Sequence, residues 1–176
     1  MKKIILIILA GLTLFTVYNR AEENETIKIP DSAIRFRVLA NSNSPRDQKI
    51  KQDIAKKMQN ELYMLLKSTK NISEARGAIN NNMDNFNNIL KEETKDLEYS
   101  YTIDYGMHEF PEKEYKGVVY DEGYYESLLV TLGEGKGDNF WCVLFPPLCL
   151  MEAEETDDTT EVEYKSFIKE IIEKYF

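Results

Sequence analysis

The chain has 176 residues, which fits one domain with appended segments and excludes two large domains. Hydrophobic residues make up 43% and charged residues 30%, the composition of a globular protein with a core of its own. Acidic residues outnumber basic ones by 31 to 22, and the resulting net charge of -9 disfavours nucleic acid as a partner. One histidine and two cysteines are too few for a zinc site built from Cys and His alone, so we expect no metal and no cofactor.

The N-terminal segment has the pattern of an export signal. Two lysines precede an uncharged apolar run from Ile4 to Val17, which has the length of a secretory signal. A membrane span needs about 20 residues, although residues 4–18 together could form a short anchor, so cleavage and retention both stay open. We predict a signal peptide or N-terminal membrane anchor over residues 1–21 and a polar spacer over residues 22–32.

The domain then opens with an alternating segment. From Ala33 to Ala40 apolar and polar residues alternate, which predicts a strand with Arg35 and Arg37 on its polar face. These arginines either pair with carboxylates on a neighbouring strand or contact a partner.

Two helices are predicted next. Ser44, Pro45 and Asp47 fit the start of a helix, as cap, first helical residue and member of a capping box, and apolar residues at helical spacing continue to about Lys67. A second helix is predicted over Ser73–Lys91, although its many asparagines are poor helix formers. The two helices predict an antiparallel hairpin that packs on a sheet.

The second half of the chain has the period of two that is typical of strands. A glycine-rich segment within it, which contains the sequence GEGKG, is predicted to be a hairpin turn, because an apolar strand and not a helix follows it. The predicted elements are a strand from Tyr99 to Tyr105, a loop from Phe110 to Gly123 with a short strand at Val118–Tyr120, a strand at Tyr125–Leu132, the turn at Gly133–Asn139 and a strand at Phe140–Phe145.

This order of elements predicts an α+β fold, with an antiparallel or mixed sheet of about four strands packed by the α-hairpin, over residues 33–150. An acidic stretch follows and predicts a solvated linker at residues 151–163. An amphipathic helix is predicted at residues 164–176. Its apolar stripe either docks on the domain or contacts a partner or a membrane surface.

Six residues separate the two cysteines, a spacing that fits neither a redox motif nor a usual zinc site. Cys142 and Cys149 would lie about 23 Å apart on one straight strand, so a disulfide requires the chain to turn back at Pro146-Pro147. A disulfide, two buried thiols and a catalytic thiol all remain open. His108 is the one candidate imidazole base, and no spacing supports it in that role, so we predict no catalytic residue.

Three segments of the sequence are specific enough to identify a resemblance to one known family. They are IRFRVLANSNSPRDQKIK (Ile34–Lys51), FPEKEYKG (Phe110–Gly117) and GYYESLLVTLGEGKGDNFWCVLFPPLC (Gly123–Cys149). The chain resembles the stage II sporulation protein R family of endospore-forming Firmicutes over about Ile34–Cys149.

The resemblance implies a signalling protein and not an enzyme. Such proteins are made in the forespore, enter the space between forespore and mother cell, and activate a membrane-embedded aspartic protease of the mother cell. That protease then cleaves pro-sigma-E, the inactive precursor of a sporulation sigma factor. The alternatives are an exported hydrolase that uses Cys142 or Cys149 with His108 on a peptide or cell-wall substrate, and a passive structural protein.

For the contact with the protease we predict a surface on the strand ends and the glycine-rich turn. Tryptophan and arginine are enriched at interface hot spots, and arginine suits contacts with carboxylates. Simple core packing is the other interpretation of the tryptophan. The candidate residues are Arg35, Arg37, Asn41, Ser42, Asn139 and Trp141.

Overall fold

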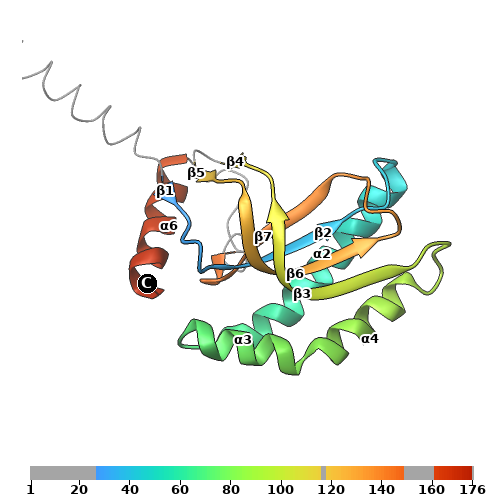
Figure 1. The fold of residues 1–176 in the computed structure, drawn as a ribbon, viewed down its shortest axis with the longest axis horizontal. Helices are drawn as coiled ribbons and strands as arrows, with labels where there is room; N and C mark the ends of the chain where they lie inside the picture. Colours follow the sequence, from blue (N-terminus) through green and yellow to red (C-terminus); the bar gives the residue numbers. More distant parts are fainter. Residues whose placement is uncertain (1–26, 116–117, 149–160, 176) are drawn as a thin grey trace, which may run out of the picture.

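The computed structural model describes residues 27–115, 118–148 and 161–175 (Figure 1). At its centre is a four-stranded sheet with the spatial order β3-β6-β2-β7. β2 runs parallel to β6 and antiparallel to β7, and β3 runs antiparallel to β6, so the sheet is mixed and the predicted α+β class is confirmed. These strands are β2 (Ile34–Leu39), β3 (Tyr101–Phe110), β6 (Gly123–Leu132) and β7 (Asn139–Phe145).

Three helices cover one face of this sheet (Figure 1). They are α2 (Pro45–Leu66), α3 (Ile72–Asn81) and α4 (Met83–Thr94). α2 begins where predicted, because the Ser44 hydroxyl accepts a hydrogen bond from the Asp47 N–H at 3.1 Å and Pro45 occupies the first turn. The apolar stripes of the helices pack on Phe36 and Val38 of β2, and each large side chain buried there contributes about 1.5–3 kcal/mol.

The second predicted helix is in fact two helices, so the prediction of one continuous helix is wrong. Asn82 separates α3 from α4 with φ -113° and ψ 8°, outside the helical region. Its side chain donates to the Ala78 carbonyl at 2.9 Å. Asparagine side chains compete with backbone N–H groups for backbone carbonyls in this way. The competition interrupts the helix, but α3 and α4 both remain packed on the sheet.

A second, three-stranded sheet lies beside the first and was not predicted as a sheet. Its strands are β1 (Ile27–Lys28), β4 (Lys113–Tyr115) and β5 (Val118–Tyr120), in the order β1-β5-β4. The sequence predicts β5 but neither β1 nor β4, and strands of two or three residues are too short to show a clear periodicity. β1 lies within the predicted polar spacer, and β4 and the last residue of β3 lie within the predicted loop, so both segments contain strand residues.

The C-terminal helix α6 (Glu161–Tyr175) docks on the domain beside β1, in agreement with the first of its two predicted interpretations (Figure 1). Ile168 and Ile171 are buried, and Tyr175 packs against Phe145 with ring centroids 5.2 Å apart. The helix begins within the predicted acidic linker, whose residues 151–160 lie outside the described part of the chain. Ile168 and Ile171 belong to a second apolar cluster with Ile29, Ala33, Tyr120, Val143 and Leu148.

The glycine-rich turn is not a hairpin turn, which corrects the prediction. β6 and β7 do not pair with each other but lie on the two sides of β2, so residues 133–138 cross over the end of β2. Gly133 and Gly135 have φ of +55° and +63°, a region that favours glycine. At Gly137 a Cβ atom would lie 2.3 Å from the Ser42 carbonyl oxygen, so the crossing requires glycine there too.

The predicted N-terminal segment, residues 1–21, lies outside the described residues. Among the helices that the structure does describe, none combines the length and the hydrophobicity of a membrane span.

Candidate partner-binding site

The face of the four-stranded sheet opposite the helices carries the polar side of β2. In the β2–β7 register Arg37 lies opposite Trp141, and Leu39 lies opposite Asn139. The register therefore brings together three of the six candidate residues, from segments about 100 residues apart in the sequence. We call Arg37, Asn139 and Trp141 the Arg37 surface.

Arg37 is half-buried and held from two sides. Its Nη1 donates to the Glu109 carbonyl oxygen at 3.0 Å. With the Asn139 amide oriented so that its oxygen faces the guanidinium, that oxygen accepts from Nη2 and Nε, each at 3.0 Å. Burial lowers the pKa of Arg37, but arginine stays charged at neutral pH in proteins. The result is a charged, oriented guanidinium in the wall of a hollow of about 590 Å³ that also includes Glu109, Phe110 and Tyr124.

Arg35 is not on an exposed polar face, and the prediction that it is exposed is wrong. Its side chain is 1% exposed, and its guanidinium carbon lies 3.3 Å from the centre of the Tyr125 ring. The rings of Phe110 and Trp141 lie 5.3 and 6.0 Å away. Strict alternation places Arg35 opposite the helices as expected, but aromatic residues cover this face as well. Arg35 is therefore part of a second core.

Asn41 and Ser42 form hydrogen bonds within the protein. Both donate to Oδ2 of Asp47, at 3.0 and 2.6 Å, and the Tyr99 hydroxyl donates to Oδ1 at 3.0 Å. The Asn41 side chain also accepts from the N–H of Glu134 at 3.0 Å. This network joins the loop after β2 to the glycine-rich crossing. The described hydrogen bonds thus give both residues a structural role, and a contact of either with a partner remains a prediction.

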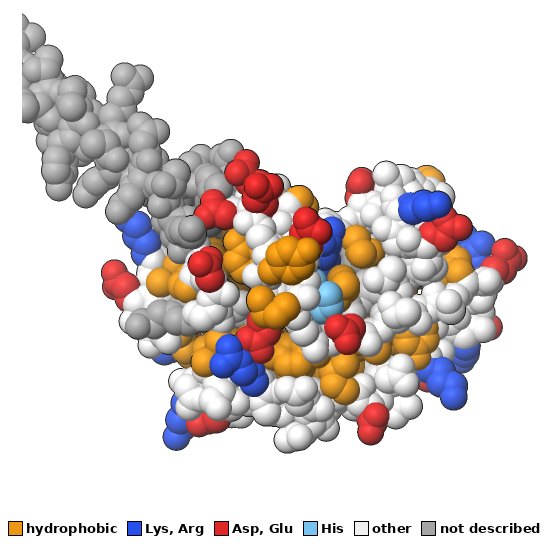
Figure 2. Space-filling view, in the orientation of Figure 1, with side chains coloured by type: hydrophobic (Ala, Val, Ile, Leu, Met, Phe, Trp, Pro, Cys, Tyr) orange, Lys and Arg blue, Asp and Glu red, His pale blue; other side chains and the backbone are white. Residues whose placement is uncertain are grey.

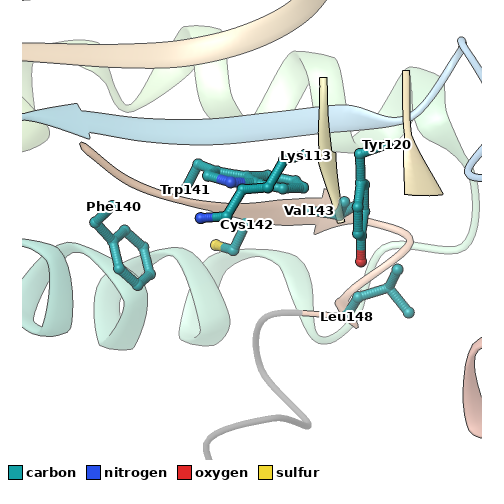
Figure 3. A pocket seen from close by; sticks show the side chains of 7 residues that line it. All are labelled: Lys113, Tyr120, Phe140, Trp141, Cys142, Val143 and Leu148. Atoms are coloured by element: carbon teal, nitrogen blue, oxygen red, sulfur yellow. The ribbon is translucent and has the colours of Figure 1, made fainter. Parts of the chain in front are cut away.

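Trp141 is partly exposed and packs mainly within the protein. Its ring meets Tyr120 edge to face at 4.4 Å between centroids, and Lys113 Nζ lies 5.5 Å from its centre. Figure 3 shows these side chains around a hollow along the outer edge of β7. The hollow has a volume of about 190 Å³, and Cys142, Val143 and Leu148 contribute to its lining.

His108 takes part in a chain of polar contacts that the sequence does not reveal. Its Nδ1 lies 2.7 Å from the Ser127 hydroxyl, and its Nε2 lies 2.9 Å from Oδ2 of Asp104. The three side chains project from one face of β3 and β6, and Gly106 between the two β3 residues leaves room for them to meet. Ser127 is completely buried, so in this structure its hydroxyl does not reach a substrate. These contacts join β3 to β6, and the arrangement supports a structural role for the three side chains.

The Cys142–His108 pair of the hydrolase alternative is not formed. Cys142 lies opposite Phe36 in the register and faces the helices, whereas His108 lies on the other face of the sheet. Cys142 is buried and disulfide-bonded. Cys149 lies outside the described residues, so the pairing of these two cysteines remains a prediction. Within the described part of the chain no group of His, Cys, Asp and Glu side chains is arranged to hold a metal ion.

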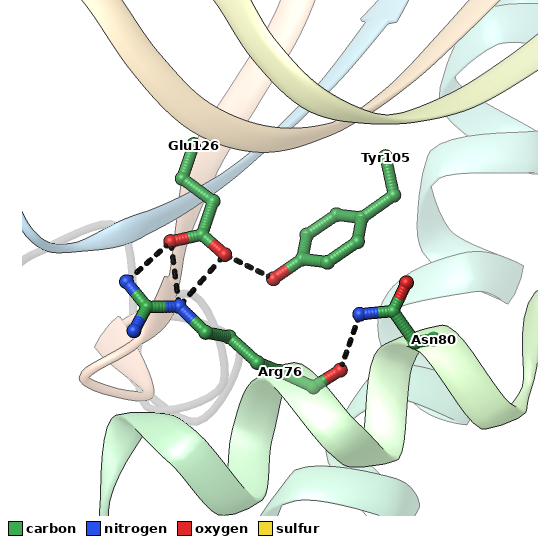
Figure 4. A network of polar contacts seen from close by, with 4 residues as sticks. All are labelled: Arg76, Asn80, Tyr105 and Glu126. Carbon is green, nitrogen blue, oxygen red and sulfur yellow. Dashed lines mark hydrogen bonds and ion pairs between the residues drawn. The ribbon is translucent and has the colours of Figure 1, made fainter.

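An ion pair fixes the helical layer to the sheet. Arg76 of α3 donates from Nε and Nη2 to the Glu126 carboxylate of β6 at 2.7–2.9 Å, and Tyr105 donates to the same carboxylate at 2.6 Å (Figure 4). Burial would raise the pKa of Glu126, but the hydrogen bonds from Arg76 and Tyr105 outweigh it and lower the pKa. Residues this far apart in the sequence give no signal of the pairing before the fold is known.

Comparisons with known proteins identify the family of this chain. The family model described as stage II sporulation protein R matches residues 30–155. The chain is 40% identical over 154 residues to stage II sporulation protein R of Bacillus subtilis (strain 168), an alignment that covers 86% of this chain and 69% of that protein. No solved structure matches the chain. The chain belongs to the stage II sporulation protein R family, which confirms the resemblance and gives it a role in sporulation.

The Asp47 network makes a testable contribution to stability. Hydrogen bonds from Ser42 and Asn41 lower the pKa of Asp47 from its ordinary 3.8, and its side chain is only 7% exposed. A lowered pKa in the folded state stabilises the fold above the unfolded-state pKa, and this contribution is lost as the pH falls through the folded-state value.

We therefore expect Asp47→Asn to reduce the free energy of unfolding by about 2 kcal/mol at pH 7, because hydrogen bonds to a charged group are weakened. The difference from the wild type should shrink toward pH 2, as followed by urea unfolding at both pH values. Asp53→Asn, which changes the same chemical group at an exposed position, is the control. A difference for Asp47→Asn that does not vary with pH would contradict this assignment.

Proposed function

We propose that this chain is an exported sporulation signal that activates a membrane-embedded aspartic protease of the mother cell and so leads to cleavage of pro-sigma-E. Membership of the stage II sporulation protein R family is the observation that carries the proposal. The protein acts in the space between forespore and mother cell, with residues 1–21 as the signal peptide or anchor. It is a ligand of the protease and does not itself cleave the precursor.

Activation by a ligand requires that the ligand bind the active state of the protease more tightly than the inactive state. The Arg37 surface supports such a role. The three described hydrogen bonds of Arg37 use three of its five N–H donors. The guanidinium is already oriented before binding, so little side-chain entropy is lost when it meets a carboxylate. Asn139 supplies that orientation, and Trp141 adds apolar area beside it.

The competing hydrolase function rests on His108, and a substitution there distinguishes the two classes. Glutamine can keep hydrogen bonds to Ser127 and Asp104 but cannot act as an acid or base. We expect sporulating cells that carry His108→Gln to process pro-sigma-E as wild-type cells do, measured by immunoblot. A catalytic imidazole contributes about 10²–10⁴-fold to rate. Loss of processing by a folded His108→Gln protein of normal abundance would therefore favour the enzyme.

A further inference from the structure

β3 is an edge strand of the four-stranded sheet, and its outer edge is regular. No other described strand pairs with it on the side away from β6. Its register with β6 is unbroken from Tyr101 to Phe110. Natural edge strands are commonly protected by lysine, proline or a bulge, and β3 contains none of these. Thr102, Asp104 and Met107 are exposed along it.

The pairing identifies which backbone groups point outward. Hydrogen-bonded and non-hydrogen-bonded pairs alternate along an antiparallel ladder. The Gly133 N–H donates to the Ser100 carbonyl at 2.7 Å, and these residues lie opposite each other when the β3–β6 register is extended by one position. Even-numbered residues of β3 are therefore bonded to β6. The odd-numbered residues direct their N–H and C=O groups to the outer edge.

A second contact agrees with this assignment. The carbonyl of Glu109, an odd-numbered residue, accepts a hydrogen bond from Arg37. That contact occupies one end of the edge. The remaining outward groups belong to Tyr101, Ile103, Tyr105 and Met107, and we call this segment the β3 edge.

The charge around the β3 edge indicates which kind of protein segment can pair with it. From Asp96 to Phe110 there are four carboxylates and no lysine or arginine. The Asp104 side chain is 72% exposed. Two copies of this chain, each with a net charge of -9, would bring like charges together at a shared edge, which disfavours self-pairing.

We infer that the β3 edge binds an extended segment of a partner protein that carries basic side chains, and that this segment adds a fifth strand to the sheet. Backbone hydrogen bonds to the odd-numbered residues provide the attachment, and lysine or arginine beside Asp104 provides the selectivity. This inference is independent of the signalling role, because it is tested with isolated peptides.

The test uses full-length ¹⁵N-labelled protein and two synthetic eight-residue peptides, one alternating valine with lysine and one alternating valine with glutamate. We expect the lysine peptide to slow amide hydrogen exchange at Ile103, Tyr105 and Met107 by about tenfold. The even-numbered amides between them, already bonded to β6, should not change. Equal protection by both peptides, or by neither, would overturn the inference. Protection that rises with protein concentration without peptide would replace the partner with a second copy.

Two variants confirm the location. Met107→Pro removes one outward N–H at a position that does not bond to β6, where an edge strand tolerates proline, and should abolish the protection. If that variant does not fold, Met107→Lys should weaken binding of the lysine peptide by adding a positive charge. Met64→Lys is its matched control, because Met64 is 60% exposed and Met107 61% exposed, and Met64 lies on α2. An equal effect of both lysine variants would contradict the assignment to β3.

Discussion

Arg35→Ala should lower the free energy of unfolding by about 3 kcal/mol, as expected when a large buried side chain is truncated. Arg35 lies in β2 between two neighbouring strands, and its guanidinium stacks on Tyr125. A desolvated contact between a cation and an aromatic ring contributes about 2 kcal/mol. Burial lowers the pKa of Arg35, because a buried environment disfavours the charged form, and Nε has no hydrogen-bond partner among the described residues.

Arg35→Met separates packing from charge. Methionine keeps most of the length and removes the buried charge, so this variant should stay within about 1 kcal/mol of the wild type. Urea unfolding of both variants provides the comparison. If Arg35→Ala is as stable as the wild type and yet fails to signal, then Arg35 is a partner contact after all, and its burial in the second core is not its main role.

Arg37→Ala combined with Asn139→Ala should give a folded, exported protein that fails to trigger processing of pro-sigma-E. Losing a hot-spot arginine costs about 2 kcal/mol or more of binding free energy, which is about 30-fold in affinity. Arg37→Lys should also be defective, since lysine keeps the charge but loses the planar fork that Asn139 and Glu109 hold.

Arg46→Ala is the matched control for this surface, because Arg46 is an exposed arginine in the first turn of α2. It should signal normally. Immunoblots report the abundance of each variant and the shortening of the precursor in the same samples. Normal processing by the double variant at wild-type abundance would show that the partner binds elsewhere on the chain.

The sequence predicts best where a local pattern is long. The capped start of α2 at Ser44 and Pro45 and the alternation in β2 and β6 are local properties, and the structure confirms them. The break at Asn82 depends on one side chain that competes for a backbone carbonyl, and propensity alone does not locate it. The crossing of residues 133–138 over β2 depends on strand order, which a local pattern does not contain.

The candidate site was predictable in part for the same reason. Alternation correctly places Arg35 and Arg37 on one face, but it does not say what covers that face. Phe110, Tyr125 and Trp141 cover Arg35, and the aromatic character of these three positions was the available signal of a second core. The hydrogen bonds of Asn41 and Ser42 to Asp47 could not be predicted, because they depend on the packed geometry of the loop.

Reconstitution in a bacterium that does not sporulate tests whether this chain activates the protease. The full chain, the membrane-embedded aspartic protease and pro-sigma-E are produced together, and the length of the precursor is measured by immunoblot. We predict that the precursor is shortened only when this chain is present, that Arg37→Ala combined with Asn139→Ala abolishes the shortening, and that Arg46→Ala retains it. A precursor that is shortened without this chain, or that stays intact when all three proteins are made in normal amounts, would contradict this prediction.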